Sequence, residues 1–90
     1  MLKIVPSNKF KKDLKLAFKR GLNLALLREV VNTLAEQKPL DQKYRDHELS
    51  GNYSGFRECH IQPDWLLVYR VENNELELFL FRTGTHSDLF

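Results

Sequence analysis

The second half of this 90-residue chain holds the side chains best suited to acid–base chemistry. All three histidines, His47, His60 and His86, lie there, and Asp64 follows His60 by four residues. An imidazole has an ordinary pKa of about 6.5, so it can accept or donate a proton near neutral pH. We expect each histidine at a loop or a strand end, where a rigid sheet presents functional groups. If these ends share one edge of the sheet, the imidazoles, Asp64 and Arg82 meet there.

Cleavage of an RNA strand is a reaction that imidazoles, a carboxylate and an arginine can perform together. A base takes the proton of the 2′-OH, whose oxygen attacks the adjacent phosphorus, and an acid protonates the departing 5′ oxygen. The forked guanidinium of Arg82 suits the phosphate oxygens. Trp65 and Phe90 can stack on an unpaired base, a contact worth about 1–3 kcal/mol. The alternatives are that Trp65 packs beside its strand and that Phe90 is a hydrophobic plug at the chain end.

Metal or thiol chemistry has less support in the spacing of the residues. The histidines are 13 and 26 residues apart, and the single cysteine allows no Cys-pair motif, whereas zinc sites commonly use closely spaced ligand pairs. We therefore expect no metal site and no cofactor. Cys59 lies between Glu58 and His60 in an alternating strand, so its thiol should point into the core and the other two side chains to the opposite face. That shared face is either an acid–base site or a plain solvent-exposed surface.

Positive charge is concentrated in the first half of the chain. Residues 1–45 hold eleven Lys or Arg against four acids, a net +7, and residues 46–90 hold three against eight, a net −5. Such a cluster of cations is either a solvated helix face or the electrostatic footprint for a polyanion such as RNA. The candidate RNA-binding residues within it are Lys11, Lys12, Lys15, Lys19 and Arg20.

Length and composition predict one globular domain over residues 1–90. Apolar residues make up 42% and charged residues 29% of the chain, as in ordinary soluble proteins. No apolar run approaches the roughly 18 residues of a membrane span, and no signal-peptide pattern opens the chain. The single cysteine cannot form an internal disulfide, so the reducing cytoplasm is the expected location.

Two amphipathic helices follow a short strand at residues 2–5. Ser7 is a suitable N-cap for a first helix that ends near Gly21, at a position where glycine commonly stops a helix. A second helix over residues 24–37 repeats the apolar spacing, and Pro39 limits its extension. Because only a short loop joins them, the two helices should form a hairpin.

Three strand-like runs occupy residues 56–61, 65–71 and 75–82, after a polar loop at residues 41–55. Asn73-Asn74 predicts a tight hairpin between the last two strands, because Asn tolerates positive φ. The order β-α-α-β-β-β predicts an α+β fold with an antiparallel sheet and the two-helix hairpin packed on one face.

Three motifs in the second half resemble a known family. The segment "DHELSGNYSGFRECHIQPDWLLVYRV" (46–71), followed by "RTGTHSDLF" (82–90), is similar to the YafQ-type branch of the RelE/ParE toxin superfamily, the toxin halves of bacterial type II toxin–antitoxin pairs. The resemblance covers essentially the whole chain, since that family also has the strand, the helical hairpin and the antiparallel sheet. It implies a metal-independent, ribosome-dependent endoribonuclease, an mRNA interferase that cuts a codon in the A site.

The resemblance also assigns residues, motif by motif. The positions that match the family's catalytic residues are His47, His60, Asp64, His86 and Phe90. Arg82 matches a phosphate-contacting arginine, Glu58 matches a position that some members use, and Trp65 lies within the same motif. On this basis we expect His86 to donate or accept the proton, and Asp64 and His60 to act near the 2′-OH and the phosphate.

The partners implied by the resemblance are the ribosome with its mRNA, and a cognate antitoxin. The antitoxin is expected to be DinJ/RelB-like, with a DNA-binding ribbon-helix-helix end and a disordered tail that wraps the toxin; no membrane is implied. Two other functions stay open. One is a toxin of the same fold that acts on another target, as gyrase-poisoning relatives do, and the other is a non-catalytic module that binds a protein through its polar face.

Overall fold

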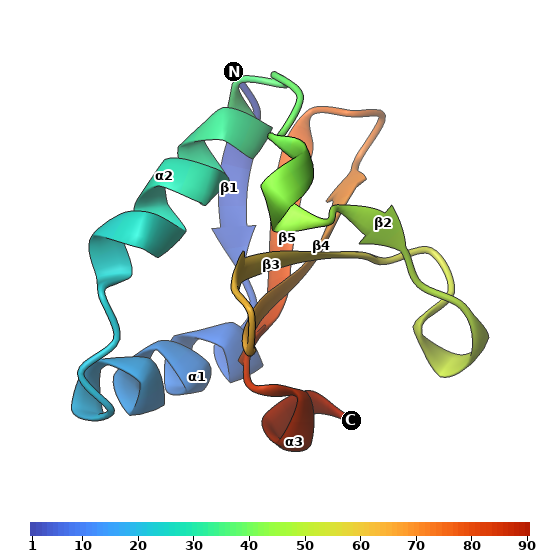
Figure 1. Cartoon of the computed structure of the whole chain (residues 1–90). Coiled ribbons are helices and arrows are strands. Elements are labelled where there is room, and N and C mark those ends of the chain that lie inside the picture. The colour runs from blue at the N-terminus through green and yellow to red at the C-terminus, as the bar shows by residue number, and fades with distance from the viewer.

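Five strands form one sheet in the order β1-β5-β4-β3-β2, in a computed structural model that describes all 90 residues. The strands are β1 (Lys3–Pro6), β2 (His47–Glu48), β3 (Arg57–Gln62), β4 (Trp65–Glu72) and β5 (Glu77–Gly84). β2 to β5 pair antiparallel with their sequence neighbours. The antiparallel pairing of β3, β4 and β5 is the one predicted, whereas β2 lies in the segment predicted to be a loop. β1 instead pairs parallel with β5, so the sheet is mixed and not purely antiparallel. The first strand of the chain thus forms the edge of the sheet beside the last strand (Figure 1).

The predicted helical hairpin consists of α1 (Asn8–Lys19) and α2 (Leu24–Ala35). Ser7 Oγ accepts a hydrogen bond of 2.9 Å from an amide in the first turn of α1, which is the N-cap that the sequence predicts. Past the end of α1, Gly21 has a φ of +76°, and a glycine in this left-handed conformation is the usual way to end a helix. The chain contains no helix with the length and apolar character that a membrane crossing demands.

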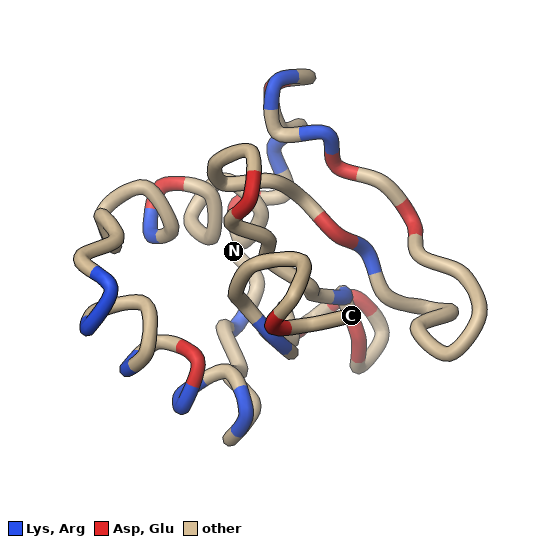
Figure 2. The backbone as a smooth tube through the Cα atoms, turned by 60° about the horizontal axis from the view of Figure 1, so that its bottom comes forward, with Lys and Arg blue, Asp and Glu red and all other residues tan.

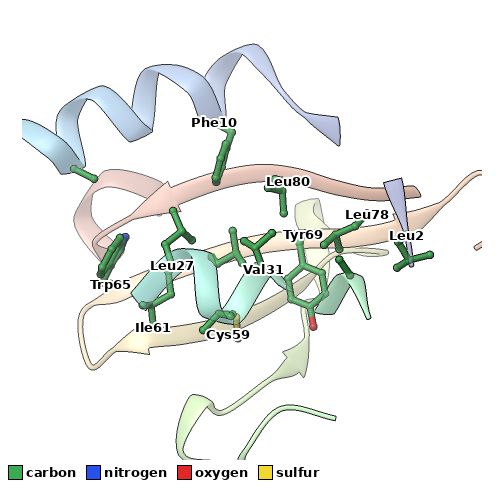
Figure 3. Packing of buried hydrophobic residues seen from close by; sticks show 14 residues of the cluster. Leu2, Phe10, Leu27, Val31, Cys59, Ile61, Trp65, Tyr69, Leu78 and Leu80 are labelled. Atoms are coloured by element: carbon green, nitrogen blue, oxygen red, sulfur yellow. The ribbon is translucent and has the colours of Figure 1, made fainter. Parts of the chain in front are cut away.

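The main core lies between this hairpin and one face of the sheet (Figures 1 and 3). Cys59 and Ile61 of β3 point into it, as predicted. Trp65 of β4 is also buried there, with 2% of its surface exposed, and its indole N–H donates to Thr83 Oγ1 at 2.9 Å. The prediction that Trp65 stacks on an RNA base is therefore wrong, because the ring has no exposed face to offer. Its alternative, packing within the fold, is the one observed.

The opposite face of the sheet carries a second, smaller apolar cluster. Leu66 and Val68 of β4 are buried there against Leu89. Leu89 belongs to α3 (His86–Leu89), a one-turn helix at the C-terminus that packs against the end of this face (Figure 1). Since the α1–α2 hairpin covers only the other face, this one remains open to the polar side chains of β2 and β3.

The polar segment 41–55 is more ordered than the predicted loop. It contains the two-residue strand β2 and two short 3-10 turns, η1 (Gln42–Tyr44) and η2 (Gly51–Tyr53). Strand β2 has too few residues to produce an alternating pattern in the sequence, and its pairing with β3 depends on the tertiary structure.

The turn between β4 and β5 is longer than the predicted tight hairpin. Residues 73–76 separate the paired Glu72 and Glu77, so β5 begins two residues later than expected. Asn73 and Asn74 both have a φ of +56°, as the Asn pair suggested, but Glu75 follows at +65°. The four-residue loop needs this third left-handed residue, which the sequence does not indicate.

Candidate active site

Two imidazoles lie against one buried carboxylate at the open face of the sheet, and a third imidazole lies beside them. The Nε2 atoms of His60 and His47 lie 3.3 Å and 3.7 Å from Oε1 of Glu58. The centroid of the His60 ring lies 6.2 Å from that of His47 and 5.6 Å from that of His86. The convergence of the three histidines that the sequence predicts is therefore present.

Strand pairing explains why these side chains meet. β2 pairs with β3 so that His47 lies directly opposite Glu58, and residues opposite each other in antiparallel strands point to the same face. Glu58 and His60 share this face, while Cys59 points into the core, where burial raises the pKa of its thiol. That excludes Cys59 as an activated nucleophile. Only 5% of the surface of Glu58 is exposed. The face that carries Glu58 and His60 is therefore not the plain solvent-exposed surface that was the alternative.

Asp64 holds His86 through two contacts. Its Oδ1 lies 2.6 Å from His86 Nδ1 and accepts a hydrogen bond of 3.0 Å from the backbone N–H of the same residue. The backbone N–H first, and then the imidazole, hold the pKa of Asp64 below its ordinary value. Because an ionised carboxylate only accepts hydrogen bonds, the hydrogen lies on Nδ1. The Nε2 atom of His86 is therefore the one that can take up or release a proton.

The other two histidines are oriented by backbone carbonyls. Nδ1 of His47 lies 2.7 Å from the carbonyl oxygen of Arg45, so this nitrogen donates and Nε2 faces Glu58. Nδ1 of His60 lies 3.3 Å from the carbonyl oxygen of Pro63, and its Nε2 faces the Glu58 carboxylate. The two nitrogens of His60 therefore face two different oxygen acceptors, which fixes the plane of the ring.

The segment that carries His47 is braced by side chains that the sequence motifs do not single out. The carboxylate of Asp46 accepts a hydrogen bond from the phenol of Tyr69 on β4. It also accepts from Nε and Nη2 of Arg57 on β3, at 3.3 Å and 3.2 Å. Burial, followed by the hydrogen bond to Asp46, raises the pKa of Tyr69, so the phenol stays a donor. His47 is thus fixed to the sheet through its neighbour in the chain.

The C-terminal tail is held in place on the fold. Thr85 and Asp88 form a capping box around the start of α3, and Asp88 also pairs at 2.6 Å with Arg20, the residue that caps the C-terminus of α1. The hydrogen bond from Arg20, followed by the backbone amide of Thr85, holds the pKa of Asp88 well below its ordinary range. Phe90 is 57% exposed and packs edge-on against Tyr53, with ring centroids 5.0 Å apart. Phe90 is therefore an exposed aromatic ring and not a plug.

The two arginines expected to contact RNA are each bound to a carboxylate. Arg82 donates from Nε and Nη2 to Asp13 of α1, at 2.7 Å and 3.1 Å, and Arg20 is bound to Asp88. Arg82 lies opposite Val68, which in turn lies opposite Glu58. Two strand spacings, about 10 Å, therefore separate its backbone from the imidazole group. Neither arginine is the free cation that the sequence suggests.

The lysines of α1 are presented to solvent. The four candidate lysines are exposed, and none of them takes part in an ion pair. Figure 2 shows the basic residues spread along the helix. This arrangement fits both a solvated face and a surface for RNA phosphates. The lysines in question are Lys11, Lys12, Lys15 and Lys19.

His47, Glu58 and His60 also form the donor set of a candidate metal site. One ligand atom from each residue lies within 4.8 Å of the other two, and two imidazole nitrogens with a carboxylate oxygen suit Zn²⁺ or Cu²⁺. The sequence-based expectation of no metal site rested on the wide spacing of the histidines. That spacing does not limit which side chains β2 and β3 bring together.

Comparison with known proteins identifies clear relatives of this chain. The family described as "Bacterial toxin of type II toxin-antitoxin system, YafQ" matches residues 2–90. The mRNA interferase toxin YafQ of Escherichia coli K12 is 39% identical over 85 residues, which cover 93% of this chain and 90% of the relative.

Solved structures agree with this relationship. A metal-bound toxin from Helicobacter pylori is 53% identical over the whole of both chains, with a TM-score of 0.94. The E. coli DinJ–YafQ toxin–antitoxin complex contains a chain that is 38% identical, with a TM-score of 0.88 and coverage of 99% of this chain and 97% of that one. These similarities extend over the strands, the helical hairpin and the tail that carries His86.

The contact between Asp64 and His86 predicts a measurable titration. Because the pKa of Asp64 is lowered in the folded state, the contact contributes stability above the ordinary pKa of about 3.9, and that contribution is lost as the pH falls through the lowered value. Substitution of His86→Ala keeps the backbone N–H, so the pKa of Asp64 should rise only part of the way to its ordinary value. Carboxyl-detected NMR titration measures this change.

The pKa of Asp88 provides the internal control for that titration, because its partners, Arg20 and Thr85, are unchanged in the variant. It should remain well below its ordinary range. An unaltered pKa of Asp64 in His86→Ala would contradict a direct contact between the imidazole and the carboxylate.

Proposed function

Because the chain belongs to the YafQ family of bacterial toxins from type II toxin–antitoxin systems, we propose that it is an mRNA interferase. It cleaves mRNA in the ribosomal A site as an endoribonuclease and so inhibits translation and growth. The observation that carries this proposal is the Asp64–His86 contact beside the ring of His60. Because its substrate is translated mRNA, we assign the protein to the cytoplasm.

The proposed reaction is attack of a ribose 2′-OH on the adjacent phosphorus. As the new P–O bond forms, the proton of the 2′-OH passes to a base, and the P–O5′ bond breaks while an acid protonates the 5′ oxygen. We assign the two proton transfers to Nε2 of His86 and Nε2 of His47. Asp64 and the carbonyl of Arg45 bind the other nitrogen of each ring and thereby fix its orientation.

In this mechanism His60 and Arg82 stabilise the negative charge of the phosphorane. The His60 ring is the common neighbour of the other two imidazoles, and its imidazolium form supplies positive charge where the phosphate oxygens become more negative. Oε1 of Glu58 lies 3.3 Å from Nε2 of His60 on the buried side of the ring. Arg82 reaches the phosphate by exchanging Asp13 for the substrate oxygens, and exposed Phe90 stacks on a base beside the cleaved bond.

The exposed lysines of α1 suit binding to ribosomal RNA. Contacts to phosphates are independent of sequence and sensitive to salt, and a helix with unpaired lysines offers several of them. Arg20 serves a different purpose in this proposal: its contact with Asp88 positions the tail that carries His86 and Phe90.

A cognate antitoxin is the second proposed partner. The E. coli relative forms a complex with the antitoxin DinJ, and we propose that a DinJ/RelB-like protein neutralises this chain. The first half of the chain carries a net charge of +7, so an acidic antitoxin segment has charge complementarity with it.

Loss of His86 should abolish most of the cleavage. Removing one general acid or base typically costs about 10²–10⁴ in rate, so His86→Ala should lower kcat by that range. Asp64→Asn should reduce kcat less, because it only misorients the ring, and deletion of Phe90 should mainly raise KM. Cleavage of mRNA on purified translating ribosomes, followed by mapping of the new 5′ ends, provides the measurement.

Lys38→Ala is the matched control, since Lys38 is exposed and pairs only with Glu36. Its cleavage should equal that of the unsubstituted chain. Full activity of His86→Ala would remove the imidazole from the mechanism. Growth inhibition without new 5′ ends would favour a toxin that acts on another target, and neither effect would favour a protein-binding module.

Charge reversal on α1 should weaken ribosome binding without unfolding the domain. Replacing Lys11, Lys12 and Lys15 by Glu removes three exposed cations, and each lost phosphate contact lowers the dependence of log K on log salt by about 0.7–0.9. Sedimentation with ribosomes across a salt series measures both effects. The control replaces Lys3, Arg28 and Lys38 by Glu, which changes the net charge by the same amount elsewhere on the surface. If the two triple variants bind ribosomes equally well, the lysines of α1 do not bind ribosomal RNA and form only a solvated face.

A second candidate function is binding of a transition-metal ion at His47, Glu58 and His60. It is favoured by the ligand atoms within 4.8 Å of one another and by the metal-bound relative from H. pylori. An ion there would occupy the nitrogen lone pair of His47 and the negative charge of Glu58, so we propose that it inhibits cleavage.

Isothermal titration with Zn²⁺ should give one site that disappears in His60→Ala and persists in His86→Ala, whose imidazole is outside the donor set. Zn²⁺ should also inhibit cleavage by protein pretreated with EDTA. If EDTA removes activity and Zn²⁺ restores it, the ion is a cofactor of the reaction and the inhibitory role is wrong.

A further inference from the structure

A cavity of about 540 Å³ opens directly beside the imidazole group. His60 forms part of its wall, and Leu26 of α2 with Ile61 and Pro63 forms an apolar surface within it. The cations Lys43 and Arg45 also line the cavity. Its volume lies in the range of about 300–1,000 Å³ that is typical of small-molecule sites.

The cavity exists because β2 is short. β2 pairs only with Arg57 and Glu58 of β3, so the edge of β3 from Cys59 to Gln62 has no neighbouring strand. The chain instead turns through η1 and Arg45, and this turn forms the other side of the cavity. A gap next to a strand edge that also carries His60 is therefore a direct consequence of the topology.

Arg45 connects this cavity to the proposed catalytic group. Its φ of +51° is left-handed, a conformation that is uncommon for a residue other than glycine. In this conformation its carbonyl oxygen lies 2.7 Å from Nδ1 of His47, and the residue also lines the cavity. The same residue thus orients one imidazole and supplies a cation to the space beside another.

The lining favours a ligand that combines a negative charge with a flat, largely apolar body. Neither Lys43 nor Arg45 takes part in an ion pair. Lys43 Nζ lies 5.1 Å from the centroid of the Tyr44 ring, a contact that leaves the charge without an anionic partner, so both cations can bind phosphate oxygens. Leu26, Ile61 and Pro63 offer the apolar contact that a nucleobase needs. A nucleotide has both parts, and the His60 wall joins this space to the position proposed for the scissile phosphate.

We propose that this cavity is the subsite for the mRNA nucleotide next to the cleaved bond, with Lys43 and Arg45 bound to its phosphate. The inference rests on the proposed RNA cleavage and adds where the flanking nucleotide is held. In the reaction the two cations bind substrate and exchange no proton, so their removal should affect KM more than kcat.

Lys43→Gln and Arg45→Gln test the subsite and leave every backbone carbonyl in place. A charge-assisted hydrogen bond to phosphate contributes enough for about a tenfold rise in KM per variant, with little change in kcat. The slope of log(kcat/KM) against log salt should fall by about 0.7 for each lost contact with the single-stranded mRNA. Lys38→Gln is the matched control, and it should behave as the unsubstituted chain in both measurements.

A binding measurement separates failure of the subsite from failure of the proposed cleavage. A 2′-O-methyl RNA trinucleotide, which cannot be cut, should shift the amide NMR signals of Tyr44, Ile61 and Gln62, and the Lys43→Gln/Arg45→Gln double variant should lose these shifts. If the unsubstituted chain cleaves RNA but the Gln variants match Lys38→Gln, the subsite is wrong. If the trinucleotide leaves these signals unmoved, the subsite is wrong whether or not the chain cleaves. Loss of antitoxin affinity alone in the variants would assign the cavity to the antitoxin and likewise overturn the proposal.

Discussion

Alternation of side chains along β3 and β4 is the constraint on which the rest of the structure depends. One face of these strands is closed by the α1–α2 hairpin, and Cys59 and Trp65 are buried there. The other face carries Glu58 and His60. A slip of one residue in the pairing would exchange the two sets, which would bury an imidazole in the apolar core and expose the indole. The free energy of packing the core is therefore also what positions the candidate site.

The acidic surplus of the second half acts through local contacts more than as a charged surface. Glu58 lies against two imidazoles, Asp64 binds His86, and Asp88 binds Arg20 across 68 positions of the chain. Asp46 accepts hydrogen bonds from Tyr69 and Arg57 beside β2. Each carboxylate limits the orientations of a longer or titratable side chain before any ligand arrives. Such preorganisation lowers the entropic cost of aligning reacting groups.

Features that depend on a pattern repeated over several residues were predicted correctly from the sequence. The placement of a single side chain was predicted less well. The helices followed from apolar spacing and from Ser7 and Gly21 at their ends. The grouping of the histidines followed from their positions at turns and from the family motifs. Trp65 was misassigned because "WLLVY" (65–69) has no alternation of apolar and polar residues, and such a run does not say which residues face the core. The capping box of α3 was readable as Thr85 and Asp88, three residues apart, whereas the contact between Arg20 and Asp88 has no local signal.

By itself, the sequence determined the two helices, the three long strands, the sign of the charge on each half and the set of residue types available for acid–base chemistry. These properties depend on interactions within a few residues of each position, or on composition alone. The tertiary structure decided which carboxylate binds which cation, that Arg82 is paired with Asp13 of α1, and that a cavity opens beside His60 at the uncovered edge of β3. These depend on how distant segments cross, because a contact between residues far apart in the chain exists only after the core has fixed the distance between them.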